Sequence, residues 1–197
     1  MAHLVLLTGL PGIGKTTIAT ALPRPFYQRI HFGALLRSVV ERRTSKPLTH
    51  TQFRHDFSRL IDAGVLHGAS VLARHEADLS SSEVCVLDSH AVTPTAVGLR
   101  VTPDDSKRRR LLRFKAIVHL GLAGCLRRVL ANCGSEGRHA LSEADAQVAE
   151  YLQLSTGVVY AASYDCPLLV VKADGNIEQT VRRVDAAIRS AVGWWSS

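Results

Sequence analysis

The stretch Leu4–Thr17, LVLLTGLPGIGKTT, places a glycine-rich turn directly after a short apolar run. Gly9 is followed by four residues and then by Gly14, Lys15 and Thr16, which is the spacing of a phosphate-binding loop. Glycines let the backbone turn tightly so that its N–H groups face phosphate oxygens, and a helix that follows points its positive end at the same place. The pattern therefore predicts binding of a nucleoside triphosphate.

The side chains of this loop fit the same chemistry. Lys15 supplies a positive charge that can follow a transferring phosphoryl group, and the hydroxyl of Thr16 can bind Mg²⁺. We therefore predict ATP and Mg²⁺ as cofactors. The predicted nucleotide-binding residues of the loop are Gly9, Gly12, Ile13, Gly14, Lys15, Thr16 and Thr17.

Length and composition indicate one ordinary α/β domain. The chain has 197 residues, of which 46% are hydrophobic, so we predict a single domain over 1–197. No basic leader or cleavage site precedes the first apolar run, and no run is long enough to span a bilayer. The four cysteines are scattered without a CxxC pair, which favours reduced thiols. We expect a cytoplasmic protein with no membrane partner.

The net charge of +7 has two interpretations. A basic surface can bind nucleic acid. Alternatively, an enzyme that holds two phosphorylated ligands needs many arginines around one cleft, because guanidinium groups bind phosphate bidentately. The basic residues are not interleaved with aromatic residues, so the second interpretation is favoured and nucleic-acid binding stays open as the weaker one.

Hydrophobic periodicity predicts helices and strands in alternation. Strands are expected at 4–7, 26–32, 83–87, 115–120 and 168–171. Helices are expected at 17–22, 33–43, 51–78 with possible interruptions near Gly64 and Gly68, 122–131, 142–164 and 177–192. The Thr-, Pro- and Gly-rich region 91–107 has no predicted element. This order predicts a P-loop NTPase fold with a five-stranded parallel sheet flanked by helices.

Charged residues outside the loop point to phosphoryl transfer. Asp88 ends a buried strand, where a carboxylate can hold Mg²⁺ together with Thr16. Arg37 and Arg54 lie between the second and third predicted strands, and Arg128 and Arg138 flank the loop after the fourth. Transfer between two bound molecules needs positive charge on both sides of the moving group.

The chain resembles nucleoside monophosphate kinases, and specifically the archaeal-type adenylate kinases. The most similar stretches are TGLPGIGKTT (8–17) and LDSHAV (87–92). Weaker similarity covers FGALLR (32–37) and RHALSEAD (138–145). The resemblance implies transfer of a phosphoryl group from MgATP to AMP.

The same resemblance implies roles for individual residues. A helical segment at about 33–80 would bind the acceptor, and a short lid at about 127–142 would close over the phosphates. The implied acceptor-binding residues are Gly33, Arg37, Arg54 and His90. The implied catalytic residues are Lys15, Asp88, Arg128 and Arg138, and backbone at Asp174 and Gly175 would hold the adenine of ATP.

Two departures leave the acceptor open. Ala34 stands where the family has an acid, and 101–113 has no counterpart in detail. One alternative is therefore a kinase for a nucleoside or a specialised metabolite, and a second is an ATPase that acts on ribonucleoprotein. The arginine run 108–110 is interpreted as a solvated face, and neither the oligomeric state nor a role for 194–195 is predicted.

Overall fold

The centre of the molecule is a five-stranded parallel sheet. The computed structural model describes residues 2–95, 98–102, 106–122, 124–132 and 141–194. The strands follow the spatial order β2 (Tyr27–His31), β3 (Val84–Asp88), β1 (His3–Gly9), β6 (Ala116–Gly121) and β7 (Leu168–Lys172). The strands β1, β3 and β6 are buried along almost their whole length, as expected for a sheet covered on both faces. The predicted α/β fold with five parallel strands is confirmed.

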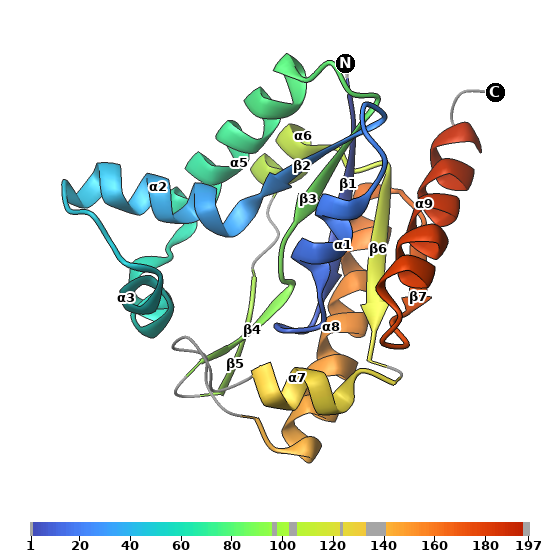
Figure 1. The fold of residues 1–197 in the computed structure, drawn as a ribbon. Coiled ribbons are helices and arrows are strands. Elements are labelled where there is room, and N and C mark those ends of the chain that lie inside the picture. Colours follow the sequence, from blue (N-terminus) through green and yellow to red (C-terminus); the bar gives the residue numbers. More distant parts are fainter. Residues whose placement is uncertain (1, 96–97, 103–105, 123, 133–140, 195–197) are drawn as a thin grey trace.

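Helices cover both faces of this sheet (Figure 1). One face packs against α1 (Lys15–Ala21) and α9 (Ile177–Trp194). The other face packs against α2 (Phe32–Thr44), α5 (Ala63–Leu79) and α8 (Glu143–Tyr164). The helix α8 begins with a capping box between Ser142 and Asp145. No helix within the described residues is long and apolar enough to cross a membrane.

Two short elements lie beyond the carboxyl ends of the strands, where α/β sheets bind ligands (Figure 1). The helix α7 (Leu126–Asn132) follows β6, and the strands β4 (Val92–Thr95) and β5 (Gly98–Val101) form an antiparallel hairpin after β3. The region 91–107 therefore contains regular structure that we did not predict, and α7 begins four residues later than expected. Short hairpin strands outside the main sheet show too few alternating residues to stand out in a sequence.

The predicted helix at 51–78 is wrong as a single element. The chain forms α3 (His50–His55), α4 (Phe57–Leu60) and α5. The interruptions lie at Asp56 and at Ile61 and Asp62 rather than at Gly64 or Gly68. The Asp62 side chain accepts a hydrogen bond of 2.8 Å from the backbone N–H of Val65 and so begins a new helix.

The helix α6 (Ser106–Leu112) corrects our interpretation of the arginine run at Arg108, whereas Arg110 is exposed as expected. Arg108 is only 5% exposed. Its Nε donates a hydrogen bond of 3.2 Å to the hydroxyl of Ser70, and its guanidinium lies over the ring of Phe32. This arginine therefore supports the core beneath α2 and α5 rather than facing solvent.

Candidate functional site

The glycine-rich turn between β1 and α1 has the backbone shape of a phosphate-binding loop. Gly9, Gly12 and Gly14 all have positive φ, and Gly14 is the N-cap of α1. A Cβ added to Gly9 would lie 2.8 Å from the carbonyl oxygen of Leu120, so only glycine fits there. The buried Lys15 donates hydrogen bonds of 2.8 Å to the carbonyls of Gly9 and Leu10. These two hydrogen bonds hold its ammonium over the loop.

The carboxylate of Asp88 faces this loop from the end of β3. Its Oδ2 accepts a hydrogen bond of 2.7 Å from the Thr16 hydroxyl and lies 3.1 Å from Nη2 of Arg29 on β2. The parallel pairing of β3 with β1 and β2 brings these side chains together. Asp88 is only 4% exposed, so the carboxylate is fixed in one orientation by a hydroxyl and a cation.

The charges around Asp88 keep it ionised. Burial alone raises the pKa of a carboxyl group, but the Lys15 ammonium, the hydroxyl of Thr16 and the nearby His90 and His31 together lower the pKa of Asp88 below its ordinary value. A buried carboxylate that carries its full negative charge beside a hydroxyl provides the oxygen ligands that Mg²⁺ prefers. The pair Thr16 and Asp88 thus fits a magnesium ion bound together with phosphates.

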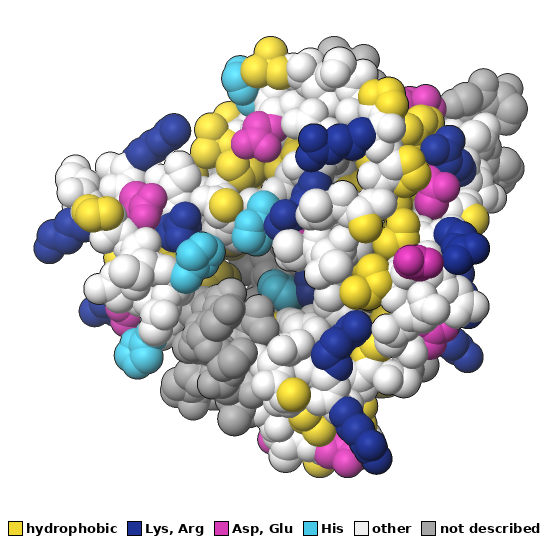
Figure 2. All heavy atoms as spheres, viewed as in Figure 1, with side chains coloured by type: hydrophobic (Ala, Val, Ile, Leu, Met, Phe, Trp, Pro, Cys, Tyr) yellow, Lys and Arg dark blue, Asp and Glu magenta, His cyan; other side chains and the backbone are white. Residues whose placement is uncertain are grey.

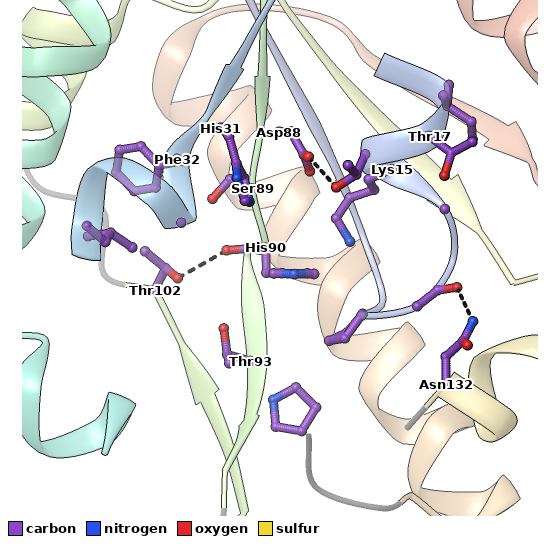
Figure 3. A pocket seen from close by; sticks show the side chains of 18 of the residues that line it. Lys15, Thr17, His31, Phe32, Asp88, Ser89, His90, Thr93, Thr102 and Asn132 are labelled. Carbon is purple, nitrogen blue, oxygen red and sulfur yellow. Dashed lines mark hydrogen bonds between the residues drawn. The ribbon is translucent and has the colours of Figure 1, made fainter. Parts of the chain in front are cut away.

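A cavity of about 650 Å³ opens in front of these groups. In Figure 3, Lys15, Asp88 and His90 project toward a common space, and Phe32, Thr93 and Thr102 lie across from the loop. Figure 2 shows the molecule hollowed on this face, with histidine, lysine and arginine side chains around the hollow. The size matches the range of small-molecule sites in proteins.

The wall opposite the loop is largely apolar and comes from α2, α3, α4 and α5. Its apolar lining residues are Phe32, Leu36, Phe53, Phe57, Ile61 and Leu66. Polar side chains at its rim are His31, Arg37, His50 and Arg100. Burial lowers the pKa of His31, although Asp88 opposes this, so this imidazole is neutral at pH 7.

The helix α7 contributes a cation behind the loop. Arg128 donates a hydrogen bond of 2.7 Å to the carbonyl of Ile13, and Asn132 donates one of 3.4 Å to the carbonyl of Gly12. Both side chains line the cavity. A Cβ on Gly14 would lie 3.4 Å from Nη2 of Arg128, so the guanidinium sits close to the loop backbone.

The segment after β7 borders the cavity by its backbone. Gly175 and Asn176 line the cavity, whereas the Asp174 carboxylate lies 2.7 Å from Nη1 of Arg183. Gly175 has a positive φ of 92°. This part of the chain offers main-chain groups to a ligand and keeps its carboxylate in an ion pair.

Most of the predicted site residues meet at this one cavity. Those that line it are Gly12, Gly14, Lys15, Thr16, Thr17, Gly33, Arg37, Asp88, His90, Arg128 and Gly175. Gly9 and Ile13 support the loop from behind: Gly9 packs against Leu120, and Ile13 is fully buried. Arg138 and the side chain of Arg54 lie outside the described residues.

The structure adds three residues that the sequence patterns did not single out. Arg100, from the hairpin, lies over the Phe57 ring and donates hydrogen bonds to the carbonyls of Phe57 and Ile61. Arg29 pairs with Asp88, and the side-chain amide of Gln153 on α8 donates a hydrogen bond to the carbonyl of Gly9 in the loop. Arg29 and Arg100 lie on short strands that carry no recognisable motif, so the residues next to them in the sequence do not indicate a functional role. Gln153 shows one signal: it is a polar residue on the buried face of its helix.

Comparisons with known proteins support the fold. No protein-family profile and no curated protein matches this chain. Among solved structures, TT1252 from Thermus thermophilus is similar over 96% of this chain and 97% of that chain, with 17% identity and a TM-score of 0.57. A sugar kinase from a Janibacter species is similar over 95% of both chains, with 19% identity and a TM-score of 0.51.

A gluconokinase from Sinorhizobium meliloti is also similar, over 98% of this chain and 95% of that chain, with 17% identity and a TM-score of 0.48. At these identities the similarity establishes a shared fold. Function has to be argued from the residues of the cavity.

Proposed function

We propose that this protein is an ATP-dependent kinase that transfers the γ-phosphoryl group of MgATP to a small acceptor, and that the acceptor is AMP or a related nucleotide. The observation that carries this proposal is a single cavity with a phosphate-binding loop on one side and an apolar, arginine-rimmed wall on the other. Asp88 and His90 lie between the two sides. An ATPase without an acceptor has no need of the second wall.

The donor side would hold the triphosphate. On binding, the Lys15 ammonium would exchange the carbonyls of Gly9 and Leu10 for phosphate oxygens, and the loop N–H groups would surround the β-phosphate. Thr16 and Asp88 would hold Mg²⁺, which supplies positive charge against the phosphate oxygens. Arg128, already against the loop backbone, would contribute charge from the side of α7.

The acceptor side supports a molecule with a flat apolar part and an anionic part. The rings of Phe53 and Phe57 pack edge to face and, with Leu36 and Ile61, form a wall suited to a nucleobase. Arg37 at the rim suits its phosphate group. His90 lies next to Asp88 at the end of the sheet, and its proposed role is to position the attacking oxygen.

A second candidate is a kinase for a hydroxylated metabolite. The fold shared with a protein described as a sugar kinase favours it. An uncharged sugar would not use the positive charge of Arg37 at the rim, so we place this candidate second.

The test is ADP formation from MgATP with a panel of acceptors. The panel holds AMP, CMP, UMP, GMP, free nucleosides, gluconate and simple sugars, beside a reaction without acceptor. We expect strong stimulation by AMP. Stimulation by a sugar or a nucleoside alone would move the proposal to the second candidate, and hydrolysis indifferent to every acceptor would contradict a kinase and favour a ribonucleoprotein ATPase.

Arg37→Met is predicted to weaken binding of the acceptor without weakening binding of ATP. The side chain lines the cavity, and its Nε lies 3.8 Å from the Glu41 carboxylate one turn along α2, a separation long enough for the guanidinium to turn toward a phosphate. Loss of one charge-assisted phosphate contact of roughly 1.5–3 kcal/mol should raise the acceptor KM about 10- to 100-fold. The KM for ATP should stay unchanged.

The control for this prediction is Arg42→Met on the same helix, whose exposed side chain does not line the cavity. Steady-state kinetics with each substrate varied in turn would measure both constants. An equal rise of both KM values in Arg37→Met would remove Arg37 from the acceptor subsite.

A further inference from the structure

One backbone carbonyl in the site has more donors than it can bind well. The oxygen of Gly9 accepts hydrogen bonds from Lys15 Nζ at 2.8 Å, His90 Nδ1 at 3.1 Å and Gln153 Nε2 at 3.2 Å. A carbonyl oxygen has two lone pairs. Since a carbonyl only accepts, His90 must carry its proton on Nδ1 in this contact.

Gln153 is fully buried and uses its whole amide. Its Nε2 donates to the carbonyls of Gly9 at 3.2 Å and Val92 at 2.6 Å. Its Oε1 accepts from the Thr8 hydroxyl and from the Ala91 N–H, both at 3.2 Å. The amide orientation is therefore settled, because oxygen faces two donors and nitrogen faces two acceptors.

These four contacts join two segments that face each other across the site. Thr8 and Gly9 begin the phosphate-binding loop, whereas Ala91 and Val92 directly follow His90. Gln153 therefore fixes the backbone on the carboxyl side of His90 and also the carbonyl to which the imidazole donates. Without this amide, the His90 ring would lose the contacts that fix the backbone after it and the contact that fixes the Gly9 carbonyl.

We propose that Gln153 is a positioning residue that acts through His90. It holds the imidazole in a fixed position and orientation relative to the phosphate-binding loop. When a triphosphate draws Lys15 away, His90 and Gln153 are the two donors that match the two lone pairs of the Gly9 oxygen. The carbonyl then keeps its direction, and the imidazole keeps its place beside Asp88. The kinetic part of this inference rests on the proposed function.

The decisive experiment combines Gln153→Met with His90→Ala. Methionine has a similar length but neither donates to Gly9 nor accepts from Thr8. We expect Gln153→Met to lower kcat about 10- to 100-fold, the scale of a misplacement of about 1 Å in an active site. The dissociation constant for ADP, measured by calorimetry, should change less than about threefold. In the His90→Ala background the same substitution should lower kcat no further, since both act through one ring.

A readout independent of turnover is the tautomer of His90. In ¹⁵N-histidine spectra, assigned by their loss in His90→Ala, the wild type should show the Nδ1–H form before and after ADP is added. Gln153→Met should shift the ring toward the Nε2–H form. If no acceptor supports transfer by the wild type, the proposed function fails while this spectroscopic arm still tests the role of Gln153.

Gln147→Met on the exposed side of α8 is the matched control and should leave kcat and the tautomer unchanged. Should Gln153→Met not fold, Gln153→Asn serves instead, because it keeps an amide in the buried site while its shorter side chain cannot make the four contacts at once. An unchanged tautomer would overturn the proposal. A kcat loss that is equally large in the His90→Ala background would overturn it as well.

Discussion

Lys15→Met is expected to reduce phosphoryl transfer by about 100- to 1000-fold, the effect of removing one preorganised group that stabilises transition-state charge. Lys15 is 4% exposed, and its ammonium donates hydrogen bonds to two carbonyls of the loop, which it can exchange for phosphate oxygens. A cation placed over the loop beforehand loses little energy in reorganisation when the ligand arrives.

The fold should survive this substitution. Methionine fills nearly the same volume and removes a buried charge, so the melting temperature should not fall by more than a few degrees. Lys46→Met, in the exposed loop after α2, is the control and should transfer phosphate at the wild-type rate. Acceptor-dependent ADP formation and a thermal melt measure both effects. Wild-type turnover by Lys15→Met would exclude this cavity as the site of transfer.

Asp88→Asn is expected to lower turnover by about 100-fold or more, because it removes the buried carboxylate next to Thr16. It also leaves the guanidinium of Arg29, at 3.1 Å from Oδ2, without its charged partner. Titration of Mg²⁺ at fixed ATP should show that the variant needs a higher metal concentration for half-maximal rate. Asp78→Asn, which removes an exposed pair with Arg74 on α5, should leave both quantities unchanged.

The same substitution should alter stability in acid. The pKa of Asp88 is lowered in the folded state, so its ionised form stabilises the fold above the pKa of an unfolded aspartate, near 3.8. That stabilisation is lost as the pH falls through the lowered pKa. Urea unfolding between pH 2 and 7 should therefore show a weaker acid dependence for Asp88→Asn. Parallel curves for the two proteins would contradict an ionised, stabilising Asp88.

Local patterns were enough to predict the donor side of the site. The spacing of Gly9, Gly14 and Lys15 determines both a backbone conformation and a charge within a few residues. Short apolar runs predicted four strands of the sheet, and the alternation of apolar and polar residues over 26–32 predicted β2. Asp88 was found because it ends such a strand.

The acceptor side was harder to predict, since its residues depend on tertiary placement. Arg100 reaches the cavity only because the hairpin folds back toward the break between α4 and α5, and that break was itself predicted in the wrong place. The break is caused by Asp62, whose side chain caps the start of α5. The apolar spacing of the sequence fits an uninterrupted helix equally well, so it gave no sign of this break. Gln153 acts at a distance of 144 residues from Gly9, which no local pattern can reveal.

The central position of β1 has a consequence for synthesis on the ribosome. This strand is synthesised before both of its neighbours, β3 and β6, and well before Gln153, which donates a hydrogen bond to its loop. At roughly 5–20 residues per second, the 144 residues from Gly9 to Gln153 take about 7 to 29 seconds to translate. Until β3 and β6 have been made, this apolar strand lacks its sheet partners, and a nascent chain cannot complete the nucleotide site before Gln153 has emerged.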